Sequence, residues 1–175
     1  MSFLRELNPV LLLRPATPAD VALVLSWTPE PEALRRWSGP ATRWPATPGS
    51  FWEDINNSDA TTFAYDSPET GLVAFGQVRF REQTYGHLAR VIVSPAQRGR
   101  GHGRAVCVAL MREAPRLHPI TAYSLYVFPD NHHAIGLYRS LGFVENGMHP
   151  KFNCVLMQAP LSAGEGGAGD LNPLV

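Results

Sequence analysis

The sequence predicts a mixed α/β fold, with a mostly antiparallel central sheet flanked by helices. Short β-type segments and helical segments alternate along the 175 residues, which is typical of an α/β domain. Three consecutive β-type segments in the middle are separated only by turn signals, which indicates an antiparallel meander. Two strands, around Val91 and Leu125, are each followed directly by a helix.

The predicted elements are strand 10–14, helices 17–27, 30–37 and 50–57, strands 61–65, 72–81 and 87–93, helix 103–114, strand 121–128, helix 132–141, and strands 143–145 and 151–158. The first helix has a clear start, because Thr17 can cap it and Asp20 favours the positive end of the helix dipole. The next two helices have apolar residues on one side, and Ser50 is the expected cap of the third helix.

Turn residues delimit the rest of the chain. The segment after Gly103 is apolar on nearly every side, which predicts a helix covered by sheet and neighbours. Pro115 is expected to end this helix, since proline has no amide hydrogen to donate. Asp130 or Asn131 is the expected cap of the last long helix, and Gly142 its end.

Composition predicts one domain at residues 1–161. The chain is 45% hydrophobic, enough for one core but too short for two comfortable domains. Residues 162–175 are Gly/Ala-rich and are expected to be a disordered tail. Cys107 and Cys154 are expected to be inert thiols rather than a disulfide framework.

Charge and hydropathy exclude several classes of partner. Fifteen basic residues balance fifteen acidic ones, so a nucleic-acid or membrane-surface partner is not expected. The apolar residues 9–13 are too few to span a bilayer and lack a signal-peptide cleavage pattern. We therefore expect a cytoplasmic protein. The sequence does not decide the oligomeric state and leaves a homodimer open.

The most informative segment is residues 91–104, where a strand leads through a Pro turn into an Arg/Gly loop that opens a helix. Glycines let the backbone approach a ligand closely, and the first helical amides have no intrahelical acceptor. This arrangement predicts a phosphate or pyrophosphate site. The spacing does not fit G-x-G-x-x-G, because position 104 is Arg104, and no Gly-Lys-Ser or Gly-Lys-Thr occurs, which excludes dinucleotide and P-loop binding.

The pattern that fits is R-x-x-G-x-G, formed by Arg98, Gly101 and Gly103 after V-x-V-x-P. This pattern resembles the acetyl-CoA loop of the GCN5-related N-acetyltransferase (GNAT) family. Residues 131–143 resemble the second motif of that family, N-x-x-A-x-x-L-Y-x-x-L-G-F. The two motifs occur in the family's order and cover residues 91–143, whereas residues 1–86 agree mainly in element order. The resemblance implies the acyl-CoA N-acyltransferase fold, with the central sheet splayed where the cofactor enters.

The resemblance also implies the residues that hold acetyl-CoA. They are the backbone of Val91, Ile92 and Val93, the loop residues Arg98, Gly99, Arg100, Gly101, His102, Gly103 and Arg104, and the side chains of Asn131 and Tyr138. Tyr138 would act as general acid toward the CoA thiolate, a role that suits a phenol protonated at neutral pH. The alternative interpretation is that Asn131 only caps a helix and that Tyr138 only packs in the core.

The sequence offers three candidates for the residue that removes the proton from the amine. Family members that acetylate ribosomal-protein N-termini often carry a glutamate five positions before the asparagine, and that position is Tyr126 here. His87, Glu82 or a water chain ending on Tyr126 are the candidates for base or proton relay. No metal site is expected, because the adjacent His132 and His133 would point about 100° apart on a helix.

The resemblance therefore implies an acetyl-CoA-dependent N-acetyltransferase acting by direct attack of a primary amine. The acceptor is a small molecule or a peptide N-terminus, and the changed position 126 favours a small molecule. The alternative is a non-catalytic acyl-CoA-binding regulatory module that has lost the acceptor chemistry. The resemblance implies that the N-terminal helical portion walls the acceptor site, and the aromatic residues there either face that site or simply pack in the core. They are Trp27, Trp37, Trp44, Phe51 and Trp52.

Overall fold

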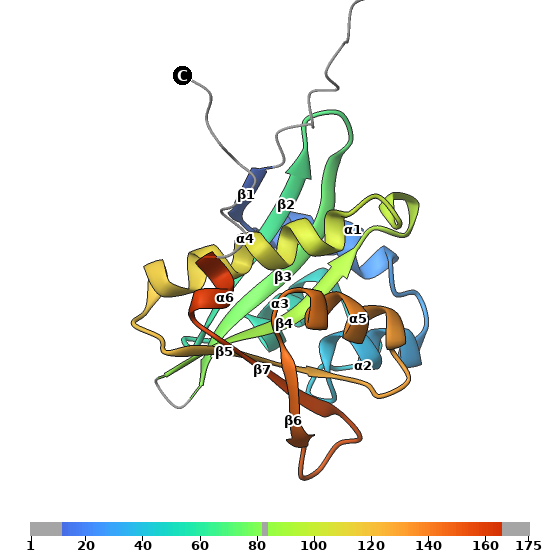
Figure 1. The fold of residues 1–175 in the computed structure, drawn as a ribbon. Coiled ribbons are helices and arrows are strands. Elements are labelled where there is room, and N and C mark those ends of the chain that lie inside the picture. The colour runs from blue at the N-terminus through green and yellow to red at the C-terminus, as the bar shows by residue number, and fades with distance from the viewer. Residues whose placement is uncertain (1–11, 82–83, 166–175) are drawn as a thin grey trace, which may run out of the picture.

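The computed structural model describes residues 12–81 and 84–165 (Figure 1). The strands are β1 (Leu12–Pro15), β2 (Ala60–Ser67), β3 (Gly71–Arg81), β4 (Tyr85–Val93), β5 (Ala122–Val127), β6 (Val144–Met148) and β7 (Val155–Pro160). The helices are α1 (Pro18–Ser26), α2 (Pro31–Ser38), α3 (Pro48–Ile55), α4 (His102–Leu117), α5 (His132–Ser140), α6 (Ser162–Glu165) and a 3-10 turn, η1 (Pro95–Gln97).

The described strands form one seven-stranded sheet in the order β1-β2-β3-β4-β5-β7-β6. All neighbours are antiparallel except β4 and β5, which are parallel. The predicted meander corresponds to β2, β3 and β4, and the mostly antiparallel α/β architecture is confirmed.

The sheet separates two apolar cores, with α4 on one face and α1 to α3 on the other (Figure 1). On the α4 side, Val106, Leu110 and Met111 are buried against β-strand residues. On the other side, Phe51 of α3 and Phe75 of β3 are fully buried. Two separate cores leave the sheet covered on both faces, as its apolar strands require.

Helix α3 begins earlier than the sequence predicts. Its cap is Thr47, whose Oγ1 accepts a 3.1 Å hydrogen bond from the backbone N–H of Ser50. Ser50 is therefore the third residue of the helix rather than its cap, and its side chain accepts in return from the backbone N–H of Thr47. The prediction chose the wrong member of a reciprocal capping pair.

The prediction that Pro115 ends the helix at residue 114 is also wrong, since α4 continues to Leu117 with Pro115 inside it. Proline cannot donate to the carbonyl four residues earlier, which is that of Met111. The hydroxyl of buried Tyr123 donates to this carbonyl instead, at 2.8 Å. A side chain from β5 thus satisfies the acceptor that the proline leaves open.

Two predicted segments, at the two ends of the chain, extend beyond the described residues. The first strand is observed from Leu12, and residues 10 and 11 lie outside the described part. We expected a disordered tail from Ser162, whereas Ser162–Glu165 form the short helix α6, and residues 166–175 lie outside the described part. None of the helices in residues 12–81 and 84–165 is long and apolar enough to cross a membrane.

Candidate active site

Strands β4 and β5 separate partway along their length. Their parallel pairing runs from Tyr85 opposite Ala122 to Leu88 opposite Leu125. Beyond these residues β4 continues to Val93 and β5 to Val127, but no further pairs join the two strands. The backbone of residues 91–93 therefore borders a split in the sheet, which the resemblance implied as the cofactor entrance.

A bulge in β4 begins where the pairing with β5 ends. Gln77 of β3 lies opposite Ala89, and Phe75 lies opposite Ile92, so two residues of β4 match one of β3. Arg90 lies in this bulge with a φ of 51°, the one non-glycine residue with positive φ among those described. Such a conformation disfavours residues with a Cβ and requires support from the surroundings.

Buried Gln77 supplies that support. Its Oε1 accepts a 2.7 Å hydrogen bond from Nη1 of Arg90. Its Nε2 donates to the carbonyl of Ile55 at 3.0 Å and to Oγ1 of Thr62 at 2.6 Å. The bulge is thereby tied to α3 and β2. The sequence analysis did not identify Gln77 or Arg90, because the bulge depends on strand pairing rather than on a local pattern.

The loop between β4 and α4 depends on two glycines. Gly99 has a φ of 75° and Gly101, the helix cap, a φ of 83°, a region that glycine enters without steric cost. The first intrahelical bond runs from the amide of Ala105 to the carbonyl of Gly101. The amides at positions 102 to 104 therefore have no acceptor within α4, as the sequence predicts for an anion site.

Gly103 is different from these two glycines, because its φ is not positive. A Cβ at this position would lie in ordinary contact with Leu137, 3.5 Å from its Cδ2. An alanine would therefore fit at position 103, and the structure does not require glycine there as it does at Gly99 and Gly101. Two of the three glycines of the segment are thus required by their backbone conformation, a distinction that the sequence does not show.

The loop arginines point in different directions. Nε of Arg98 donates to the carbonyl of Val93 at 3.3 Å, and Nη1 of Arg104 donates to Oγ of Ser140 at 2.8 Å. Arg100 is exposed and makes no hydrogen bond or ion pair with the described residues. His102 is only 9% exposed, and its Nδ1 has no hydrogen-bond partner within the described chain.

Asn131 caps α5, since its Oδ1 accepts a 3.2 Å hydrogen bond from the amide of Ala134. Its side-chain NH2 group is left for another partner. On the same helix, Tyr138 packs edge-on against Phe143, with ring centroids 5.9 Å apart. Burial, with a smaller contribution from Cys107, raises the pKa of Tyr138 well above its ordinary value. The hydroxyl therefore keeps its proton at neutral pH.

His87 and Tyr126 come together on the sheet face opposite α4. His87 is 4% exposed, and its Nδ1 shares a 2.8 Å hydrogen bond with Oγ of Ser124. The rings of His87 and Tyr126 lie 5.3 Å apart. Two of the three candidate base or relay residues are thus neighbours. The third, Glu82, lies outside the described residues.

The structure adds His149, which the sequence analysis missed. Its ring meets that of Tyr126 at 4.8 Å and that of Phe152 at 4.7 Å. His149 lies in the loop between β6 and β7, outside both sequence motifs. No sequence signal marks it, because the contact exists only once β5 and β7 have paired.

The aromatic residues of the N-terminal helices mostly pack in the core. Trp37 stacks on Phe51 at 5.3 Å and meets the edge of Phe75 at 6.1 Å. Trp44 is 51% exposed. In this part of the chain, Trp37 therefore packs in the core, whereas Trp44 exposes its side chain to solvent.

No group of three or more His, Cys, Asp or Glu side chains that could hold a metal ion occurs in the part of the chain that the structure describes. His132 and His133 are both exposed. The two cysteines are free, and Cys107 is fully buried.

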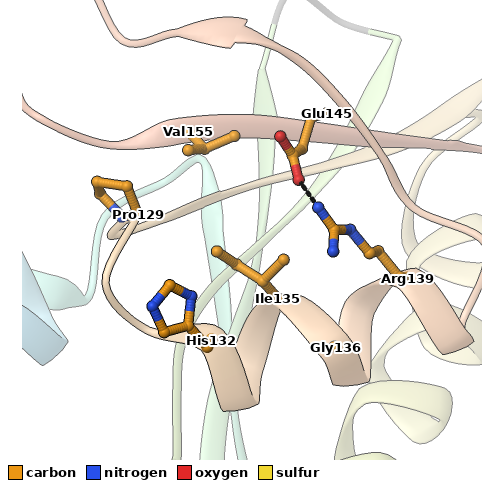
Figure 2. Close-up of a pocket in the computed structure, with 7 residues that line it drawn as sticks. All are labelled: Pro129, His132, Ile135, Gly136, Arg139, Glu145 and Val155. Atoms are coloured by element: carbon orange, nitrogen blue, oxygen red, sulfur yellow. Dashed lines mark hydrogen bonds and ion pairs between the residues drawn. The ribbon is translucent and has the colours of Figure 1, made fainter.

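A hollow of about 300 Å³ lies between α5 and the β6–β7 hairpin (Figure 2). Ile135 and Val155 form apolar walls, and an ion pair joins Arg139 to Glu145 beside them (Figure 2). The sequence-predicted site residues do not line it. This hollow is separate from the split between β4 and β5.

Comparison with known proteins agrees with this geometry. The profile of the acetyltransferase (GNAT) family matches residues 31–143. Among solved structures, spermidine N-acetyltransferase from Vibrio cholerae in complex with CoA and spermine superposes with a TM-score of 0.74 at 16% identity, covering 89% of this chain and 98% of that one. A putative acyl-CoA N-acyltransferase from Klebsiella pneumoniae has a TM-score of 0.64 at 22% identity, covering 88% and 99%.

Proposed function

This chain belongs to the acetyltransferase (GNAT) family and transfers an acetyl group from acetyl-CoA to an amine, and from this premise we propose that its acceptor is a primary amine on a small molecule. It is an enzyme rather than a non-catalytic acyl-CoA-binding module. Two features support a small acceptor: Tyr126 occupies the position where ribosomal N-terminal acetyltransferases often have a glutamate, and one structural neighbour was solved with spermine.

The residues around the β4–β5 split fit acetyl-CoA. The amides of His102, Gly103 and Arg104, preceded by Gly99 and Gly101, suit the pyrophosphate. Exposed Arg100 adds a positive charge beside them. Arg98 and Arg104 contribute their backbone here, since both side chains already have partners on Val93 and Ser140.

The remaining cofactor residues lie farther along the split. Val91, Ile92 and Val93 offer backbone groups to the pantetheine arm where β5 no longer pairs with them. The free NH2 group of Asn131 is a donor for the same arm, so capping and cofactor binding are compatible in this residue. Bound acetyl-CoA supplies the activated acetyl thioester.

Tyr138 is the general acid of the proposed mechanism. Its hydroxyl stays protonated because burial raises its pKa, and it makes no hydrogen bond within the described residues that would occupy the proton. A phenol held in this state can donate to a departing thiolate. The observation that carries the mechanism is the position of Tyr138 on α5, the helix that Asn131 caps and whose Leu137 lies next to Gly103 at the start of α4.

His87 and Tyr126 are the proposed route for the proton that leaves the ammonium form of the acceptor. They lie on the sheet face away from α4, so the acceptor approaches the split from the side of α1 to α3. His87 is held by Ser124 and contacts Tyr126. Glu82 remains a third candidate from the sequence alone.

The proposed function is tested by measuring CoA thiol release with a panel of amines that includes spermidine, spermine, arylalkylamines and short peptides. We expect release above background with at least one small primary amine and little with the peptides. Transfer to peptides alone would overturn the acceptor proposal. Tight acetyl-CoA binding by calorimetry with no transfer to any amine would overturn the mechanism.

A further inference from the structure

The loop between β6 and β7 is closed by one of its own side chains. Nδ1 of His149 accepts two backbone hydrogen bonds, from Lys151 at 3.0 Å and from Phe152 at 3.2 Å. The amide of His149 also donates to the carbonyl of Cys154 at 2.8 Å. Because a backbone N–H can only donate, Nδ1 presents its lone pair to both amides and the ring proton lies on Nε2.

The same imidazole connects this loop to β5. Its ring meets Tyr126 edge to face, with centroids 4.8 Å apart and planes at 71°. The same ring contacts that of Phe152, a residue that is 44% exposed, with centroids 4.7 Å apart. Tyr126 in turn contacts His87. A continuous row of four rings therefore runs from the loop to β4.

The two interactions of His149 depend on each other. The lone pair of Nδ1 fixes the plane of the imidazole by holding two amides, and the plane of the imidazole decides which edge meets Tyr126. Tyr126 is only half-buried, so the sheet alone does not fix its ring. A ring contact of this kind reduces the number of rotamers open to a partly exposed side chain.

We propose that His149 is a positioning residue: its Nδ1 closes the loop 149–154, and its ring holds Tyr126 in place beside His87 for the acceptor amine. This inference rests on the proposed function of Tyr126 and His87 in handling the acceptor. His149 acts through Tyr126 and takes no proton from the amine itself. It controls the amine side of the reaction and leaves acetyl-CoA binding alone.

Two substitutions separate the functions of the imidazole. His149→Asn keeps an acceptor atom at the place of Nδ1 but removes the ring, while His149→Phe keeps a ring and removes the acceptor. Lys151→Ala is the control, because it lies in the same loop and contributes only its backbone N–H.

The first readout needs no turnover. Amide hydrogen exchange at Lys151 and Phe152 should stay slow in His149→Asn and Lys151→Ala and become fast in His149→Phe. Unchanged exchange in His149→Phe would overturn the closing role of Nδ1.

The second readout is kinetic. We expect His149→Asn to lower kcat/KM for the amine about tenfold, with the KM for acetyl-CoA and the melting temperature unchanged. In a double-mutant cycle, adding His149→Asn to the Tyr126→Leu variant should lower kcat/KM for the amine little further. Adding it to the Tyr126→Phe variant, which retains the ring, should lower kcat/KM by the same factor as in the wild type.

Additive losses in the Tyr126→Leu cycle, or an equal rise in the KM for acetyl-CoA, would overturn the positioning role. These failures are distinct from failure of the proposed function. The latter would appear in the wild-type enzyme as no transfer to small amines, whatever residue stands at position 149.

Discussion

The Tyr123 hydroxyl donates a hydrogen bond to the Met111 carbonyl, the acceptor that Pro115 leaves open in α4. This single bond joins β5 to the helix that follows the cofactor loop. Both groups are buried, so losing the donor leaves a carbonyl that water does not reach.

Tyr123→Phe should therefore destabilise the protein by about 1–3 kcal/mol, measured by urea unfolding. Pro115→Ala restores an amide at the position that normally bonds to Met111. In that background the cost of Tyr123→Phe should be smaller. Equal costs in both backgrounds would show that the hydroxyl is not compensating for the proline.

Gly101→Ala should raise the KM for acetyl-CoA several-fold and reduce stability by about 1–2 kcal/mol, because its φ of 83° disfavours any residue with a Cβ. Gly71→Ala is the matched control. It has a similar φ of 72° as the first residue of β3, far in sequence from the loop before α4. It should lose comparable stability with no change in KM, and a shared rise in KM would contradict the assignment.

Tyr138→Phe should lower kcat about a hundredfold with little change in acetyl-CoA affinity, since general acid catalysis contributes at least that much. The pH dependence follows from the pKa. Because burial raises the pKa of Tyr138, the hydroxyl keeps its proton as pH rises, and kcat should show no alkaline loss from this group up to pH 10. A Tyr138-dependent fall in kcat near pH 9 would be inconsistent with this role.

The ion pair between Arg14 and Asp20 predicts acid sensitivity. A hydrogen bond from Arg14, with a further one from the backbone of Thr17, holds the pKa of Asp20 below its ordinary value of 3.8. The stabilisation is present above the unfolded pKa and is lost as pH falls through the folded one. Asp20→Asn should thus cost about 1–2 kcal/mol at pH 7 and progressively less below pH 4, measured by urea unfolding at each pH.

The two thiols should differ in reactivity. Burial raises the pKa of the Cys107 thiol to about 12 and leaves it without access to solvent. Cys154 is partly exposed, although burial raises its pKa as well. Iodoacetamide at pH 8 should modify Cys154 first and reach Cys107 only after denaturation, as mass spectrometry of the peptides would report. Rapid modification of native Cys107 would contradict its burial.

Local signals account for what the sequence predicts well. The meander follows from turn residues between strands, and the loop before α4 follows from the glycine-rich segment that contains Gly99 and Gly101, both of which have a positive φ. Each of these features is determined within a few residues of chain. The cap at Asn131 is local in the same sense.

Apart from the cap of α3, the missed features depend on partners distant in sequence. The helix passes Pro115 because of Tyr123, the Arg90 bulge is held by Gln77, and His149 meets Tyr126 only across paired strands. The misplaced cap at Ser50 is the exception, since Thr47 lies three residues away. There the error came from choosing between two suitable residues.

The bulge at Arg90 changes the face of the sheet to which the side chains of β4 point. Alternation alone would place Leu88 and Ile92 on the same face, yet Leu88 packs in the α4 core and Ile92 in the opposite core. One extra residue has inverted the side-chain phase halfway along the strand. Deleting Arg90 would therefore do more than shorten β4, because it would exchange the faces of Val91, Ile92 and Val93. The side chains of residues 91–93 therefore depend on this one inserted residue for the core against which each of them packs.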